Sequence, residues 1–134
     1  MDLKDRVLEE MLADHGDALE RNFELAKKLI RITPAGKVEI LADRNKLTGK
    51  ELILLYLIGK RYANVAGLAD SEGVSNQELM DELGMPLGSV LPWTKDLRDN
   101  NKIKAIKQGI HTIPLNNIEK ILHEIGDKLR TQQT

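Results

Sequence analysis

SNQELMDELGMPLGSVLPWTKDLRDNNKIKAIKQGIHTIPL, residues 75–115, is the stretch on which the fold class depends. Ser75 and Glu78 have the spacing of a capping box, which predicts that a short helix begins at this point. Gly84 stands where a glycine commonly ends a helix, and Pro86 favours the start of the next one. The stretch therefore opens with a short helix over residues 75–83 that ends in a tight turn.

A longer helix and a hairpin complete this stretch. Residues 87–100 have helical periodicity, with Val90 and Leu97 on the inner side. Residues 103–113 then alternate between apolar and polar around Lys107-Gln108-Gly109, which predicts a small β-hairpin. Because strands account for so little of the chain, we expect a mainly α structure with a small β-hairpin, in the α+β class.

Further helices are predicted on either side of this stretch. Thr48 and Glu51 form another capping-box pattern, so we expect a helix over residues 48–64. This segment is apolar around most of its circumference, which is typical of a core helix. Asn116 is expected to cap a last amphipathic helix.

Residues 2–31 are also predicted to be helical, because apolar side chains return at steps of three and four. Gly16 is a place where this helix can break in two, with Asp17 as the cap of the second part. The apolar stripe consists of Leu8, Leu12, His15, Leu19, Phe23, Ala26 and Ile30. Two ways of burying it remain open: against a second copy of the chain, or against the chain's own domain.

The period changes after this helix and suggests how the chain is organised. Residues 30–41 alternate around a Pro-Ala-Gly turn, which predicts a short hairpin. A polar connector follows and separates an N-terminal extension (1–45), with a possible role in dimerisation, from a main domain (46–115). Residues 116–134 form the C-terminal helix, for packing or dimerisation.

Composition excludes several classes of protein. The chain has 134 residues, 41% of them hydrophobic, which is the balance of a small globular domain. It has no cysteine, which excludes disulfide scaffolds, and fits a cytoplasmic location. The apolar run 52–58 is too short to cross a bilayer, so no membrane partner is expected. The three histidines lack ligand spacing and no nucleophile or dinucleotide motif is present, so we expect no metal, no cofactor and no enzyme activity.

The order of predicted elements over residues 48–115 resembles the winged helix-turn-helix regulators of archaea and bacteria. That family favours a small polar N-cap, Glu-Leu shortly after it, Leu-Gly at the turn, and spaced apolar residues beyond. These places are filled by Ser75, Glu78-Leu79, Leu83-Gly84, Val90, Leu97 and Ile103. The resemblance implies a DNA-binding transcriptional regulator, commonly a homodimer, in which helix 87–100 enters the major groove and the hairpin, or wing, lies beside it.

Charge is distributed as this resemblance would require. The whole chain has a formal net charge of −1, whereas residues 87–113 have a balance of +3 and residues 1–31 a balance of −2. Lys104 and Lys107 are the first candidates for phosphate contacts, with His111 in support. The full set of expected DNA contacts is Ser89, Leu91, Lys95, Arg98, Lys102, Lys104, Lys107 and His111.

Two features of helix 87–100 leave a second interpretation open. Asp96 and Asp99 would face phosphates unfavourably, and the chain as a whole is nearly neutral. The alternative is a winged-helix module that binds a protein through an exposed patch of Leu91, Pro92 and Trp93. In that case Trp93 is exposed, whereas otherwise we expect it to pack against the hairpin. The hairpin lysines would then serve only to keep an exposed strand edge soluble.

Overall fold

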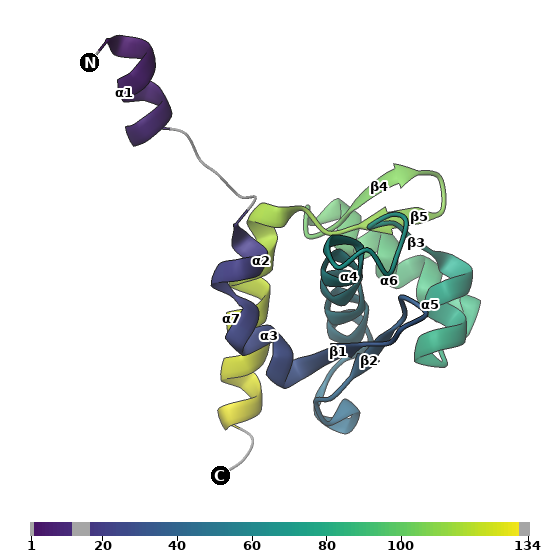
Figure 1. Cartoon of the computed structure of the whole chain (residues 1–134). Helices are drawn as coiled ribbons and strands as arrows, with labels where there is room; N and C mark the ends of the chain where they lie inside the picture. The colour runs from purple at the N-terminus through teal and green to yellow at the C-terminus, as the bar shows by residue number, and fades with distance from the viewer. Residues whose placement is uncertain (1, 12–16, 132–134) are drawn as a thin grey trace.

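The computed structural model describes residues 2–11 and 17–131, which form a mainly helical chain with two small antiparallel sheets (Figure 1). The expected α+β class is confirmed at this level. In chain order the elements are α1 (Leu3–Glu10), α2 (Ala18–Arg21), α3 (Phe23–Leu29), β1 (Ile30–Ile32), β2 (Val38–Ile40), the 3-10 turn η1 (Arg44–Lys46), α4 (Gly49–Val65), β3 (Val74–Ser75), α5 (Asn76–Leu83), α6 (Leu87–Asp99), β4 (Lys104–Lys107), β5 (Ile110–Thr112) and α7 (Leu115–Thr131).

Helix α4 lies at the centre of the molecule. Every residue from Leu52 to Lys60 is buried, which confirms the prediction of a helix apolar around most of its circumference. The β1–β2 hairpin packs on one side of α4, and α5, α6 and α7 pack on others (Figure 1). One hydrophobic cluster therefore extends from β1 to α7.

Local capping signals position the central helices. The capping box at Thr48 is complete, because its hydroxyl accepts from the Glu51 backbone N–H (3.2 Å) and the Glu51 carboxylate accepts from the Thr48 N–H (2.8 Å). At Ser75 only half of the expected box forms: the hydroxyl accepts from the backbone N–H of Glu78 (3.0 Å). Gly84 ends α5 in the left-handed region at φ 66°, as its position predicts.

The three-stranded sheet has the order β3-β5-β4, and all its pairings are antiparallel. The hairpin predicted over residues 103–113 is present as β4 and β5, with an irregularity between Ala105 and Lys107. Strand β3 was not predicted. Its two residues are too few to show any alternation, and Ser75 is also the cap of the following helix.

The prediction of one continuous helix over residues 2–31 is wrong. Ala18–Arg21 and Phe23–Leu29 are separate helices, because the chain breaks at Asn22, whose buried side-chain amide donates to the Ala18 carbonyl (2.8 Å). Asp17 precedes α2 as expected, but its carboxylate binds Arg21 instead of a backbone N–H. Beyond the break Phe23 is 49% exposed, whereas Ala26 and Ile30 are buried. Leu12, His15 and Gly16 lie outside the described residues.

The apolar face of α7 is buried within its own chain. Ile118, Ile121, Leu122 and Ile125 are at most 5% exposed, and the helix packs against α2, α3 and α4. Of the two roles expected for residues 116–134, the structure shows packing. None of the helices in the described part of the chain has the length and apolar character needed to span a membrane.

Candidate nucleic-acid interface

Helix α6 and the β4–β5 hairpin lie next to each other because the core holds the inner face of α6. Val90, Thr94 and Leu97 are buried, and the Thr94 hydroxyl donates to the Val90 carbonyl (2.8 Å). Lys102 lies three residues after the end of α6, and its backbone N–H donates to the Leu97 carbonyl (2.9 Å). The outer face of α6 and the strand β4 are therefore presented together.

His111 lies beneath this surface rather than on it. Its side chain is 1% exposed, so the expectation that it contacts a phosphate is wrong. The ring connects three elements: Nε2 is 2.7 Å from the Asn76 Oδ1 on α5, and Nδ1 is 3.4 Å from a guanidinium nitrogen of Arg98 on α6. With its proton on Nε2, the neutral ring donates to Asn76 and accepts from Arg98. Burial and the Arg98 charge both lower the pKa of His111.

Arg98 is consequently half-buried and directed toward His111, not free on the outer face of α6. Asn76 also anchors the hairpin through its backbone, because its N–H donates to the Gly109 carbonyl (3.2 Å). The role of Asn76 was not predicted from the sequence, since 35 residues separate it from His111.

Both acidic side chains of α6 that sequence analysis regarded as unfavourable have cationic partners. The Asp96 carboxylate accepts a hydrogen bond from Lys50 on α4, which lowers the pKa of Asp96. The Asp99 carboxylate lies 2.7 Å from Lys95 Nζ, one helical turn earlier. These pairs compensate the two negative charges, and Lys95 and Lys50 are the cations that do so. Lys50 was not predicted because it lies on a different helix, 46 residues away.

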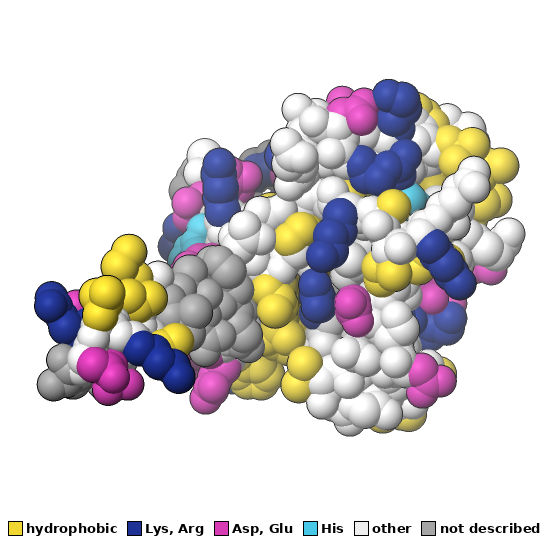
Figure 2. Space-filling view, turned by 90° about the horizontal axis from the view of Figure 1, so that it is seen from above, with side chains coloured by type: hydrophobic (Ala, Val, Ile, Leu, Met, Phe, Trp, Pro, Cys, Tyr) yellow, Lys and Arg dark blue, Asp and Glu magenta, His cyan; other side chains and the backbone are white. Residues whose placement is uncertain are grey.

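The remaining cations of this surface are exposed. Lys102, Lys104 and Lys107 have no ion-pair partner among the described residues. Lys104 and Lys107 both belong to β4, which is exposed along its whole length. Figure 2 looks down on the end of the molecule that carries β4 and shows Lys and Arg side chains spread over that face, with acidic side chains among them.

The uncharged candidates on α6 divide into exposed and packed residues. Leu91 is 48% exposed and Pro92 is also exposed, whereas Ser89 is half-buried. Trp93 is half-buried and lies against Gly49 at the start of α4, so it is not an exposed member of the patch. The three-residue apolar patch considered above is therefore reduced to its first two members.

The geometry thus combines a helix with compensated acids, an exposed edge strand bearing lysines, and a buried histidine that joins them. A scan against protein-family models finds no match to this chain, and searches of curated proteins and of solved structures find no significant match either.

Proposed function

We propose that residues 46–115 form a winged helix-turn-helix that binds double-stranded DNA, and that the protein is a transcriptional regulator. The order of α4, β3, α5, α6 and the β4–β5 hairpin supports this proposal. In such a unit α6 enters the major groove and the hairpin lies along the neighbouring phosphates.

One observation carries the proposal: Lys102, Lys104 and Lys107 are exposed and lack ion-pair partners in the described chain, while Asp96 and Asp99 beside them are already paired. An ion-paired carboxylate repels a phosphate less than a free one does. The surface of α6 and β4 therefore offers positive charge without the repulsion that the sequence suggests. Phosphate contacts of this kind release counterions and supply most of the affinity for DNA.

The outer face of α6 offers few groups that can distinguish bases. Ser89 can donate or accept a hydrogen bond, and Leu91 can contact a thymine methyl group. Lys95 is the remaining candidate for a base edge, and it must leave Asp99 to reach one. We therefore expect binding in which phosphate contacts dominate and sequence preference is modest.

The test is a fluorescence-anisotropy titration of the full chain on a random duplex at several salt concentrations. We expect binding at low salt that weakens steeply as salt rises. Lys104→Ala and Lys107→Ala should each weaken binding to all duplexes alike and reduce the salt slope by about one unit. Lys28→Ala is the matched control, because Lys28 is an exposed lysine on α3, outside this surface, with no ion-pair partner in the described chain.

An unchanged salt slope in both hairpin variants would show that Lys104 and Lys107 do not contact the phosphates of DNA. A wild-type chain that fails to shift the duplex at micromolar protein and low salt would overturn the DNA-binding function itself.

The second candidate function is a protein-binding module, and the exposed leucines of α6 favour it. Leu87 and Leu91 are four residues apart, so they lie on one face of the helix, and both are close to half exposed. Pro92 extends this apolar surface. If the duplex titration shows no binding, this surface becomes the preferred interface, and Leu91→Lys is the variant that should abolish capture of the partner protein.

A further inference from the structure

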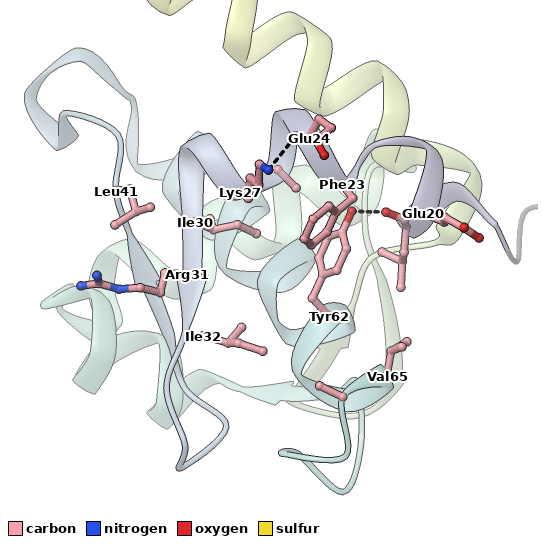
Figure 3. Close-up of a pocket in the computed structure, with 13 residues that line it drawn as sticks. Glu20, Phe23, Glu24, Lys27, Ile30, Arg31, Ile32, Leu41, Tyr62 and Val65 are labelled. Atoms are coloured by element: carbon pink, nitrogen blue, oxygen red, sulfur yellow. Dashed lines mark hydrogen bonds and ion pairs between the residues drawn. The ribbon is translucent and has the colours of Figure 1, made fainter.

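An apolar groove of about 720 Å³ lies on a different side of the chain from α6. It runs between α2, α3, β1 and the C-terminal end of α4 (Figure 3). We call it the N-terminal groove. Its lining includes Leu19, Phe23, Ile30, Leu41, Tyr62 and Val65. The rings of Phe23 and Tyr62 are neighbours, tilted by 57° with centroids 6.4 Å apart, and Val65 is 73% exposed.

The polar groups around the groove are almost all occupied. The Tyr62 hydroxyl donates to the Leu19 carbonyl (2.5 Å), Lys27 pairs with Glu24 (2.7 Å), and Arg31 pairs with Glu39 (2.5 Å). A small-molecule site needs a few converging polar groups that fix the orientation of its ligand. The groove lacks them, so its chemistry suits an apolar surface such as one face of a helix.

Helix α1 presents such a face. Leu3, Val7, Leu8 and Met11 recur at helical spacing and are 40–76% exposed. In Figure 1 the helix stands apart from the rest of the chain. An isolated helix of this length, eight residues, is marginal in water because packing supplies most of a helix's stability. Helix α1 therefore requires a surface to pack on.

We propose that the N-terminal groove binds α1 of a second copy of this chain, and that the exchange is reciprocal in a two-fold homodimer. The single chain leaves both surfaces uncovered, whereas the apolar face of α7 is buried within it. Lys4 on α1 and Glu20 at the rim of the groove are opposite charges without ion-pair partners in the described chain, so the helix and the groove carry complementary unpaired charges.

Area also favours reciprocal exchange over a single contact. Helix α1 is only about 12 Å long at about 1.5 Å per residue. One such helix in one groove buries much less than the roughly 1,200–2,000 Å² of a stable interface, whereas two helices in two grooves double the area. This inference does not depend on DNA binding.

Cysteine cross-linking tests the occupant, because the natural chain contains no cysteine. Met11→Cys and Val65→Cys chains are mixed and oxidised, and the disulfide-linked species are identified by mass spectrometry. We expect the yield of the disulfide between Cys at position 11 of one chain and Cys at position 65 of the other to be about tenfold higher than that of the 11–68 reference. Docking raises the effective concentration of the first pair of thiols but not of the second. The 11–68 reference is Met11→Cys mixed with Leu68→Cys, since Leu68 is exposed near Val65 but does not line the groove.

Light scattering on the full chain gives an independent measurement. We expect the wild type to have twice the chain mass of 15.1 kDa, and Val7→Lys and Val65→Lys each to return it to one chain mass. Leu68→Lys should leave the dimer intact. Mixing the Val7→Lys and Val65→Lys chains should give a heterodimer that is weaker than the wild-type dimer. In it, the unchanged α1 of the Val65→Lys chain meets the unchanged groove of the Val7→Lys chain, while the other contact is lost.

Three results would overturn the proposal. A monomeric wild type would do so. A dimer unaffected by Val7→Lys and Val65→Lys would place the interface elsewhere. If a Met11→Cys/Val65→Cys double variant forms the disulfide within one chain while the mixed single variants form none, α1 packs in its own groove. Thermal melting of each lysine variant by circular dichroism confirms that it is folded, which is expected because the altered side chains are exposed.

Discussion

His111 shows how one buried side chain holds a candidate binding surface together. Asn76, Arg98 and the ring of His111 connect α5, α6 and β5. The neutral ring satisfies both neighbours: one nitrogen donates to the Asn76 amide oxygen, and the other accepts from Arg98. A proton added at Nδ1 would point an N–H toward the guanidinium, which itself carries only donors. Burial and this positive charge therefore favour the neutral ring.

This geometry predicts a pH dependence of folding. Because the pKa of His111 is lowered in the folded state, the unfolded chain binds more protons just below the ordinary value of 6.5. The contribution to the free energy of unfolding is fully present above that pH and falls as the pH drops toward the folded-state pKa. Urea denaturation at closely spaced pH values should show this decline, and His111→Gln should flatten it.

His123→Gln is the control, because His123 lies on the exposed face of α7. It should retain the wild-type pH dependence. Three carboxylates with lowered pKa act in a separate, more acidic window. The contribution of Glu51 and Glu78 is present above about pH 4.5 and that of Asp96 above about pH 3.8, and each is lost as the pH falls further. An identical decline in His111→Gln and the wild type would contradict the role given to His111.

Glu78 illustrates a choice that sequence spacing leaves open. Its carboxylate accepts from the Tyr56 hydroxyl (2.5 Å) and from Lys60 Nζ (2.9 Å) instead of closing the capping box at Ser75. Lys60 is 8% exposed and requires a carboxylate partner there. Burial opposes ionisation of Glu78, but the two hydrogen bonds and the positive charge nearby lower its pKa overall. The electrostatic demand of a buried lysine thus outweighs a local capping interaction.

The contact between α4 and α6 depends on one glycine. A Cβ atom added at Gly49 would clash with the Trp93 ring, so the first turn of α4 and the side of α6 meet too closely for any larger residue. Gly49→Ala should therefore displace the indole and destabilise the protein by about 1–3 kcal/mol through overpacking. The measurement is urea denaturation followed by the fluorescence of Trp93, the single tryptophan of the chain.

Gly88→Ala is the matched control on α6. A Cβ at Gly88 meets no atom within 4 Å, so the same substitution should stabilise the helix by about 0.5–1 kcal/mol. Its tryptophan emission should remain that of the wild type. If Gly49→Ala also proved stabilising, Trp93 would not be packed against α4, and the apolar patch of Leu91, Pro92 and Trp93 would again be complete.

At the scale of the whole molecule, the two proposals concern separate surfaces of the described residues: the cationic face of α6 and β4, and the N-terminal groove with α1. If both proposals hold, a dimer presents two α6 helices to one duplex, with half-sites about one helical turn apart. Binding by both units then exceeds the affinity of either alone, because the second contact becomes intramolecular.

Val65→Lys tests this coupling. The monomeric variant should bind a duplex long enough for one half-site as well as the wild type does. On a duplex long enough for two, it should bind at least about tenfold more weakly. Anisotropy on the two duplexes gives the comparison. Leu68→Lys adds the same charge outside the groove and should behave as the wild type on both. Equal losses in the two variants would attribute the effect to charge and not to assembly.

Helix starts and turns could be predicted from the sequence because their causes are local. A cap and its partner are three residues apart, and the left-handed turn at Gly84 depends on one residue. The same holds for both hairpins, whose alternation and turn residues lie within a dozen positions of each other. Local backbone chemistry thus accounts for the starts of α4, α5 and α6, and for the lysines that β4 exposes. The cap expected at Asn116 is wrong, because α7 begins one residue earlier, at Leu115.

The character of the candidate site depends on contacts between distant parts of the chain. Lys50 compensates Asp96 from 46 residues away, and Asn76 places His111 under the hairpin from 35 residues away. The break at Asn22 turns Phe23 out of the core and into the N-terminal groove. No periodicity encodes such pairings, because burial and charge compensation arise only when separate elements pack together.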